Sequence, residues 1–214
     1  ASGIADDLLT TVISAATAPV LIAPSMNTLM WENPITAANV EKLKKLGYLF
    51  AGPEEGPLAC GYEGVGRLAC VEAILEAAQD ALSPRDLSGE KVLVTAGPTR
   101  EAIDPVRFVS NASSGKMGYA LAKAARRRGA EVVLISGPSY LPRPSGITFV
   151  PVISAEEMHD ACVMYYPQST LVIMSAAVAD YKPKKSYPAK VKKDAKELTM
   201  EMERTNDVLK YMGR

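Results

Sequence analysis

Short apolar runs alternate with helical patterns along the downstream half of this chain, and this alternation limits the folds that it can adopt. Residues 91–95, 131–136 and 170–174 have the length and apolar character of buried strands. Amphipathic patterns typical of helices lie between them, over residues 116–128 and from residue 154 onward. Strands that alternate with helices predict an α/β protein with a Rossmann-like parallel sheet and flanking helices on both faces.

A polar, turn-forming stretch divides the chain. Residues 83–90 carry Ser, Pro, Asp and Gly between two more apolar segments, and few contacts are expected to cross such a stretch. We therefore expect two domains, residues 1–84 and residues 85–214. In the first, the patterns predict helices through about residue 16, over 35–46 and over 68–82, strands over 19–24 and 48–51, and loops over 25–34 and 52–67.

A Ser/Gly-rich turn precedes the first downstream helix. It reads Asn111-Ala-Ser-Ser-Gly-Lys-Met-Gly118, and such a turn presents several backbone N–H groups and the positive end of the helix dipole. Proteins hold phosphate chains in this way, yet the stretch matches neither Gly-x-x-x-x-Gly-Lys-Ser/Thr nor Gly-x-Gly-x-x-Gly. Spacing alone leaves two interpretations open, a phosphate site and an ordinary tight turn.

Three further loops follow predicted strands, at residues 96–99, 136–138 and 175–180. Ligands of parallel sheets lie outside the carboxyl ends of the strands, so these loops and the Ser/Gly turn are expected to share one crevice. Asp180 would suit a ribose hydroxyl there, although the small residues before it also fit the start of a buried helix. Lys190, after a Lys/Pro-rich segment, would close over phosphates, and the alternative is a solvated basic edge.

The charge balance excludes some classes of partner. Lys plus Arg and Asp plus Glu both number 24, so the net charge is zero and no global field attracts nucleic acid or an acidic membrane. No apolar run approaches the ~20 residues that a membrane-spanning helix needs. The 3 cysteines show no short paired spacing, which argues against a zinc site and favours a reducing cytoplasm. Cys70 and Cys162 lie in helical patterns typical of small core residues, and His159 has no evident partner.

Several motifs resemble one enzyme family and occur in the order that the family has them. Upstream, Pro24-Ser-Met-Asn27 resembles a signature of flavin-dependent cysteine decarboxylases, and Leu58-Ala-Cys-Gly61 resembles their substrate-clamping flap. The downstream motifs are Ala96–Glu101, Asp104–Arg107, Ser110–Gly118, Ala176–Tyr181 and Lys190–Lys193. Together they make the whole chain similar to the bacterial bifunctional phosphopantothenoylcysteine decarboxylase/phosphopantothenate–cysteine ligases.

The resemblance implies a ligase reaction in residues 85–214. A carboxylate of 4′-phosphopantothenate attacks the α-phosphate of CTP, Mg²⁺ reduces the charge of the triphosphate, and cysteine then displaces CMP from the acyl-cytidylate. Asn111 would hold the acyl-cytidylate, Lys190 would stabilise charge at the α-phosphate, and Arg107 would bind substrate. The resemblance assigns no metal ligand, and it alone favours CTP over ATP. The residues implied in nucleotide binding are Ser113, Gly115, Lys116, Gly118, Met174, Ser175, Ala176, Asp180, Lys190, Asn206 (where the family has Pro), Asp207, Val208 and Leu209.

The resemblance also implies that residues 1–84 are the C-terminal part of a flavodoxin-like, FMN-dependent decarboxylase domain. Asn27 would bind the substrate carboxylate there, and Cys60 would protonate the aminoenethiol intermediate. The family's first flavin-binding segment, its catalytic histidine and its last nucleotide-contacting lysines have no counterpart in this sequence. We therefore expect an incomplete FMN site and little ligase turnover from these residues alone. Family ligases form homodimers, and a higher homo-oligomer is expected of the full-length protein.

Two other classes of protein share the pattern. A non-catalytic nucleotide-binding module would need the glycines of the Ser/Gly turn and Asp180, but not Asn111, Lys190 or a cysteine on a flap. All three are present, which favours the enzyme. A short-chain NAD(P)-dependent oxidoreductase is disfavoured, because the chain lacks the Gly-x-Gly-x-x-Gly turn.

We predict that a protein consisting of residues 1–214 does not decarboxylate phosphopantothenoylcysteine, because its flavin pocket is incomplete. Flavin absorbance after desalting should show no retained FMN, and carbon dioxide release should equal that of a heat-denatured control. Stoichiometric retention of FMN, or release above that control, would contradict the prediction.

Overall fold

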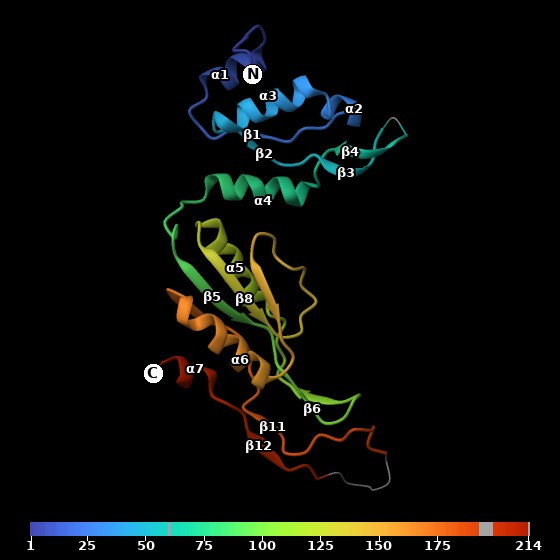
Figure 1. The fold of residues 1–214 in the computed structure, drawn as a ribbon, viewed down its shortest axis with the longest axis vertical. Coiled ribbons are helices and arrows are strands. Elements are labelled where there is room, and N and C mark those ends of the chain that lie inside the picture. Colours follow the sequence, from blue (N-terminus) through green and yellow to red (C-terminus); the bar gives the residue numbers. More distant parts are fainter. Residues whose placement is uncertain (60, 193–198, 214) are drawn as a thin grey trace. The chain divides into compact units, whose positions relative to one another are not determined.

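The structure is a computed structural model that describes residues 1–59, 61–192 and 199–213. The chain forms two compact units, Ala1–Ser83 and Pro84–Arg214 (Figure 1). Within the described ranges, every helix falls short of the length and apolar character that a membrane span requires.

A β–α–β crossover organises the first unit. The strands β1 (Leu21–Ile22) and β2 (Leu49–Phe50) pair in parallel, and α3 (Pro34–Lys45) joins them. α3 begins with a proline in its first turn and with Asn33 as its N-cap. It ends just before Gly47, whose φ of +90° only glycine adopts readily. The unit also contains α1 (Leu8–Ala15), α2 (Thr28–Trp31) and α4 (Val71–Leu82).

The Gly-rich stretch 52–67, predicted as a long loop, contains a hairpin instead. Its strands β3 (Glu54–Pro57) and β4 (Glu63–Arg67) pair in antiparallel fashion. Gly66 lies so close to the neighbouring backbone that a Cβ there would be 2.1 Å from Met26 O. Glycine has a low strand propensity, so a glycine-rich stretch is not predicted as a strand. Here the strand needs glycine, because the neighbouring backbone approaches it so closely.

Two smaller predictions for this unit are also wrong. Residues 25–34 are not entirely loop, because Asn27 caps the short helix α2 and accepts a hydrogen bond from Leu29 N–H at 2.9 Å. Cys70 is not a core residue, because it is the exposed N-cap of α4. The apolar pattern that suggested burial begins upstream of α4, so it also includes Cys70, which precedes the helix.

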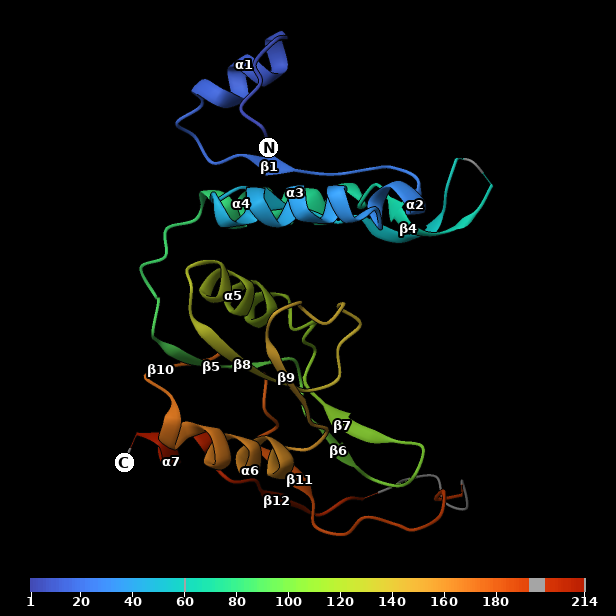
Figure 2. The ribbon, with the colours of Figure 1, turned by 45° about the horizontal axis from the view of Figure 1, so that its top comes forward.

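The second unit is built on a four-stranded parallel sheet, which confirms the predicted α/β class. Its strands lie in the order β10-β5-β8-β9. Figure 2 shows α5 and α6 on opposite sides of this sheet. The bounds are β5 (Lys91–Ala96), α5 (Lys116–Arg127), β8 (Glu131–Ser136), β9 (Thr148–Pro151), α6 (Ala155–Tyr165), a 3₁₀ turn (Tyr166–Gln168) and β10 (Leu171–Met174).

Successive residues of β5 enter two separate hydrophobic cores. Val92 and Val94 pack in the core that contains α5, whereas Leu93 packs with Met158 and Cys162 of α6. This alternation follows from the two-residue period of a strand. Cys162 is fully buried, which confirms the prediction that it is a core residue. This burial raises the pKa of its thiol to about 11.

Three acceptor side chains fix the start of α6. Ser154 is the N-cap, as its sequence predicts, and its Oγ accepts a hydrogen bond from Glu157 N–H at 3.1 Å. The carboxylate of Glu157 accepts from Ile153 N–H at 2.6 Å. The buried Glu101, far away in sequence, accepts from Ala155 N–H at 2.9 Å. The first turn of α6 is thereby joined to the segment that follows β5.

Two antiparallel strand pairs lie outside the central sheet, in segments for which no strand was predicted. β6 (Arg100–Ala102) pairs with β7 (Phe108–Ser110), and β11 (Tyr181–Pro183) pairs with β12 (Met202–Arg204). The short helix α7 (Val208–Met212) follows β12. Strands of three residues carry too little periodicity to be predicted from a pattern.

We predict that Gly118→Ala destabilises the second unit, although Ala ordinarily stabilises a helix by about 1 kcal/mol relative to Gly. A Cβ at Gly118 would lie 2.5 Å from Ala96 Cβ and 2.9 Å from Thr95 O, so α5 would have to move away from β5. The expected loss in the free energy of unfolding is about 1–3 kcal/mol, measured by urea denaturation.

Met117→Ala is the matched control, because that neighbouring side chain is 72% exposed. It should change the free energy of unfolding by no more than about 0.5 kcal/mol. Equal stability of the two variants would show that α5 does not pack as closely as described.

Candidate active site

Backbone hydrogen bonds gather three loops at the carboxyl edge of the parallel sheet. Ala177 N–H donates to Gly97 O at 2.8 Å, and Gly137 N–H donates to Ala96 O at 2.9 Å. Pro98 and Ala177 also form an isolated parallel bridge. The loops that follow β5, β8 and β10 therefore lie side by side, as expected for the strand ends of a parallel sheet.

Two buried threonines hold the segment that follows β10. Thr95 Oγ1 accepts hydrogen bonds from Ser175 N–H at 3.1 Å and from Ala176 N–H at 3.2 Å. Thr99 Oγ1 accepts from Ala179 N–H at 2.9 Å. Both side chains are fully buried. Sequence reasoning missed these two residues, and the available signal was a threonine at or just beyond the end of an apolar strand.

Because it is held in this way, the segment presents alternate side chains to a hollow of about 560 Å³. The intervening residues face the other way, and the Oγ of Ser175 is buried with no hydrogen-bond partner in the described structure. The hollow collects most of the residues implied in nucleotide binding. They are Met174, Ala176, Asp180, Asn206, Asp207, Val208 and Leu209.

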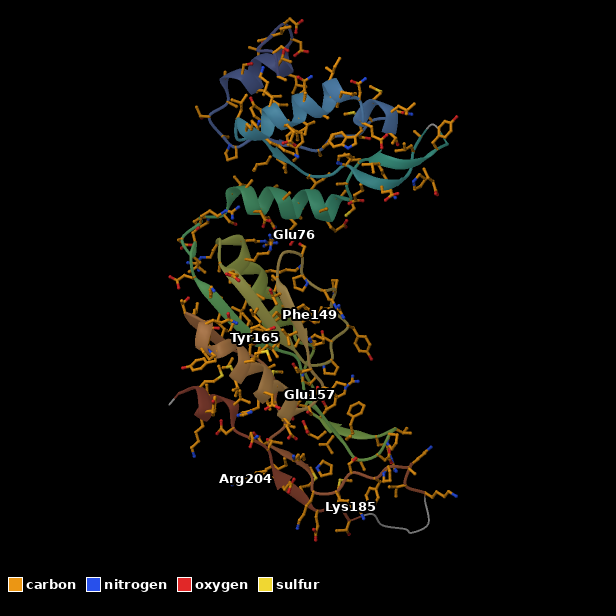
Figure 3. All side chains as sticks on the ribbon, in the orientation of Figure 1. Glu76, Phe149, Glu157, Tyr165, Lys185 and Arg204 are labelled. Carbon is orange, nitrogen blue, oxygen red and sulfur yellow. The ribbon has the colours of Figure 1, made fainter. Side chains whose placement is uncertain are left out.

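The opposite wall of this hollow is anchored to the same segment. Thr205 Oγ1 donates to Ala179 O at 2.6 Å, and Thr205 N–H donates to Asp180 O at 3.0 Å. Asp207 caps α7 and also lines the hollow. With Arg204, which Figure 3 shows on β12, the hollow has two carboxylates and one guanidinium on its border.

A second hollow, of about 410 Å³, has a different chemical character. Arg100 and Lys116 supply cationic groups, and none of the residues described as lining it is acidic. Its hydroxyl groups belong to Ser110, Ser113, Ser114, Ser139 and Tyr140, of which Ser110 and Ser139 already donate to backbone carbonyls. Cations and hydroxyls without carboxylates suit a phosphate or another anion.

Asn111 connects the two hollows. It lines the second hollow, and its Nδ2 donates to Ala177 O at 3.3 Å and to Val178 O at 3.0 Å. The side chain of Val178 lines the first hollow. Asn111 therefore joins a residue of the second hollow to the segment whose alternate side chains line the first.

Only some of the residues expected to bind phosphate in the Ser/Gly turn line a hollow. Ser113 and Lys116 line the second hollow, whereas Gly115 and Gly118 line neither hollow. Gly115 has φ +77° as the N-cap of α5, and Ser113 Oγ accepts from its N–H at 3.3 Å. Gly118 packs against Ala96 of β5. The two glycines shape the turn and seat the helix, and their expected contact with phosphate stays a prediction.

Lys190 and Arg107 lie outside the linings of both hollows. Lys190 is exposed. Arg107 Nε donates to Asp104 Oδ2 at 3.0 Å, and its Nη2 donates to Val191 O at 2.9 Å. The side-chain hydrogen bond from Arg107 holds the pKa of the Asp104 carboxyl well below its usual range. Arg107 is thus joined to the backbone next to Lys190.

The first unit brings the loop of Asn27 to the β3–β4 hairpin. Gly64 lies so close to the residue after Asn27 that a Cβ would be 2.5 Å from Thr28 Oγ1. Cys60, expected to donate a proton, lies outside the described residues. The side chain of Asn27 caps α2 through its Oδ1.

In the described part of the chain, no group of three or more His, Cys, Asp or Glu side chains is arranged to hold a metal ion. Mg²⁺ commonly keeps several waters and takes most of its remaining ligands from substrate phosphates. The donor set therefore fits Mg²⁺ only as a partner of a bound nucleotide.

Two protein families match the two units. Residues 87–214 match the family described as DNA/pantothenate metabolism flavoprotein C-terminal domain, and residues 1–83 match the family described as flavoprotein. A solved structure, the C-terminal domain of coenzyme A biosynthesis bifunctional protein CoaBC, is 50% identical, with a TM-score of 0.53 over 60% of each chain.

Curated relatives match the chain from end to end. The coenzyme A biosynthesis bifunctional protein CoaBC of Bacillus subtilis (strain 168) is 51% identical over 100% of this chain and 53% of its own length. The protein of the same name from Vibrio cholerae is 46% identical over 98% of this chain and 53% of its own length. The chain thus spans about half the length of these relatives. The resemblance predicted from the motifs is confirmed.

We predict that Thr99→Val destabilises the second unit by about 1–3 kcal/mol, because Val keeps the shape but leaves the buried Ala179 N–H without its acceptor. Urea denaturation measures the change. Thr148→Val, at an exposed position of β9, is the control and should change stability by no more than about 0.5 kcal/mol. If Thr99→Val is as stable as the control, Thr99 does not hold this segment.

Proposed function

The chain belongs to the family of the DNA/pantothenate metabolism flavoprotein C-terminal domain, and we propose that its second unit is a phosphopantothenate–cysteine ligase of coenzyme A biosynthesis. Its similarity to coenzyme A biosynthesis bifunctional proteins over the whole chain supports the proposal. The different chemistry of the two hollows gives the proposal its physical basis.

The hydrogen bonds of Asn111 carry the proposal, because they join a residue of the second hollow to the segment that lines the first. A nucleoside offers hydroxyl donors, which suit the carboxylate of Asp180 at the edge of the first hollow. A phosphorylated acid is an anion, which suits Arg100 and Lys116 of the second. An acyl-nucleotide has both parts, and its phosphate bridge would lie at Asn111.

The reaction proceeds in two balanced steps. A carboxylate oxygen of 4′-phosphopantothenate attacks the α-phosphorus of CTP, and the bond to the β-phosphate breaks to release pyrophosphate. The amino nitrogen of cysteine then attacks the acyl carbon, the acyl–oxygen bond breaks, and CMP leaves as the nitrogen loses a proton. The first step supplies the leaving group that a free carboxylate lacks.

Lys190 would offset the negative charge that accumulates in the first step. Both reactants are anions, so negative charge accumulates at the α-phosphate as they approach each other. An ammonium placed there stabilises this charge in the transition state. Lys190 is exposed, and we propose that its ammonium contacts the phosphate when CTP binds. Mg²⁺ enters as part of the nucleotide substrate.

The first unit is the candidate for the decarboxylase part of the same pathway. Its match to the flavoprotein family supports FMN binding, with Asn27 and Cys60 as the substrate-facing residues. Its described parallel sheet has only β1 and β2, and a flavin of a parallel-sheet protein lies across several strand ends. We therefore propose that the described residues supply only part of an FMN site. The homodimer and the cytoplasmic location stay predictions.

We predict that Mg²⁺ and CTP bind to the second unit more tightly than Mg²⁺ and ATP, measured by calorimetric titration. Lys190→Gln and Asn111→Asp should each weaken CTP binding by about tenfold or more. The first removes a charge from the phosphate, and the second places a carboxylate beside it. EDTA should abolish binding in all cases.

Lys91→Gln is the matched control, because Lys91 is an exposed lysine at the opposite end of β5 from the site. It should leave CTP affinity within about twofold. If nucleotide choice, Lys190→Gln and Asn111→Asp all have no effect, the site is misplaced. If CTP binds but pyrophosphate release with 4′-phosphopantothenate is absent even when the C-terminal segment of a relative is fused after Arg214, the protein is a non-catalytic nucleotide-binding module.

A further inference from the structure

The segment that carries Lys190 is attached to the loop between β6 and β7. We call residues 184–192 the lysine arm. Tyr187 N–H donates to Ile103 O at 2.9 Å, which is the first attachment. The second attachment is at Val191, which is held through both its N–H and its carbonyl. Since Val191 adjoins Lys190, this second attachment restricts the position of the Lys190 backbone, from which the lysine side chain extends.

Asp104 supplies the acceptor at the second attachment, and its side chain is 0% exposed. Oδ1 accepts from Val106 N–H at 2.9 Å and from Arg107 N–H at 2.8 Å, which closes the turn of Asp104 itself. Oδ2 accepts from Arg107 Nε and Nη2 and from Val191 N–H, the last at 3.2 Å. One oxygen therefore holds the turn, and the other holds the lysine arm.

Arg107 completes the attachment on the other side of Val191. Its Nη2 donates to Val191 O at 2.9 Å, and the carboxylate of Asp104 orients the guanidinium for this contact. The N–H of Val191 belongs to the planar peptide that starts at the carbonyl of Lys190. With that plane held, few backbone rotations remain that change the direction of the Lys190 side chain.

We propose that Asp104 is a positioning residue for Lys190, which acts with Arg107 to hold the Val191 peptide and so to fix the base from which the Lys190 ammonium reaches a nucleotide phosphate. The inference rests on the proposed function, in which Lys190 meets the α-phosphate. It also gives Arg107 a task besides the substrate binding implied by the family resemblance.

Asp104→Asn separates the two tasks of the carboxylate. The amide oxygen still accepts from Val106 and Arg107 N–H, so the turn is kept. The amide nitrogen replaces Oδ2 and meets only donors, so the contacts with the Arg107 side chain and with Val191 N–H are lost. Val191→Pro is a second variant, which leaves Asp104 unchanged and removes the N–H that donates to Asp104 Oδ2. It also fixes φ at residue 191 and restricts Lys190 to extended backbone.

Amide hydrogen exchange, followed by NMR, reports on the attachment without nucleotide. In Asp104→Asn, exchange at Val191 and Tyr187 should accelerate by about tenfold or more. Asp86→Asn is the matched control, because it breaks the similar two-point pair of Asp86 with Arg128, at 2.8 and 2.6 Å, away from the lysine arm. It should leave exchange at both amides unchanged. Unchanged exchange in Asp104→Asn overturns the inference.

A double-mutant cycle tests whether Asp104 acts through Lys190. Asp104→Asn and Val191→Pro should each weaken the binding of Mg²⁺ and CTP. Adding Asp104→Asn to Lys190→Gln should cost no more than about a further twofold, because a residue that acts through the lysine has no effect once the lysine is gone. Additive losses, or no loss in Asp104→Asn and Val191→Pro, overturn the inference while the proposed function stands.

The two proposals fail in different ways. If the unsubstituted protein does not bind CTP, or if Lys190→Gln binds it equally well, the proposed function fails, and the role of Asp104 toward a phosphate fails with it. The exchange measurement then still decides whether Asp104 holds the lysine arm. If Asp104→Asn does not fold, as judged by circular dichroism, Val191→Pro provides the same comparison with the turn of Asp104 intact.

Discussion

The hydroxyl groups of Thr95 and Thr99 support the rest of the candidate site. They accept the backbone N–H groups of Ser175, Ala176 and Ala179, which would otherwise be left without partners near the end of the sheet. By holding residues 175–179 extended, they turn every second side chain toward the first hollow. A helix at this position, the alternative that the sequence allowed, would point those side chains in several directions and would not line one hollow.

A chain with no net charge creates two different electrostatic environments within this one unit. Asp180 and Asp207 border the first hollow, whereas Arg100 and Lys116 line the second, which has no acidic residue among those described as lining it. Any attraction of a charged ligand to either hollow is therefore local, and it does not depend on the overall charge of the protein. Asn111, hydrogen-bonded to the extended segment, stands between them. This arrangement suits a molecule whose two ends differ in charge and hydrogen-bonding character.

The accuracy of the sequence predictions follows the strength of the local signal. β8 was predicted with its observed bounds, and β5 and α5 to within one residue, because apolar periodicity is strong there. The β3–β4, β6–β7 and β11–β12 pairs were missed, since their strands are short or rich in glycine. Gly118 was interpreted as part of a phosphate turn, but its place against Ala96 is a packing requirement that a motif does not reveal.

By itself, the sequence determined the α/β class, the family, and the strand-end loops that carry the site. These follow from local periodicity and from ordered motifs, which are properties of neighbouring residues. Only the tertiary structure decided which atoms meet: the threonine hydroxyls and the segment after β10, Asn111 and its two carbonyl partners, Asp104 and Val191. Those partners lie between 66 and 87 residues apart. No local pattern encodes such pairings, because they depend on how the sheet brings distant strand ends together.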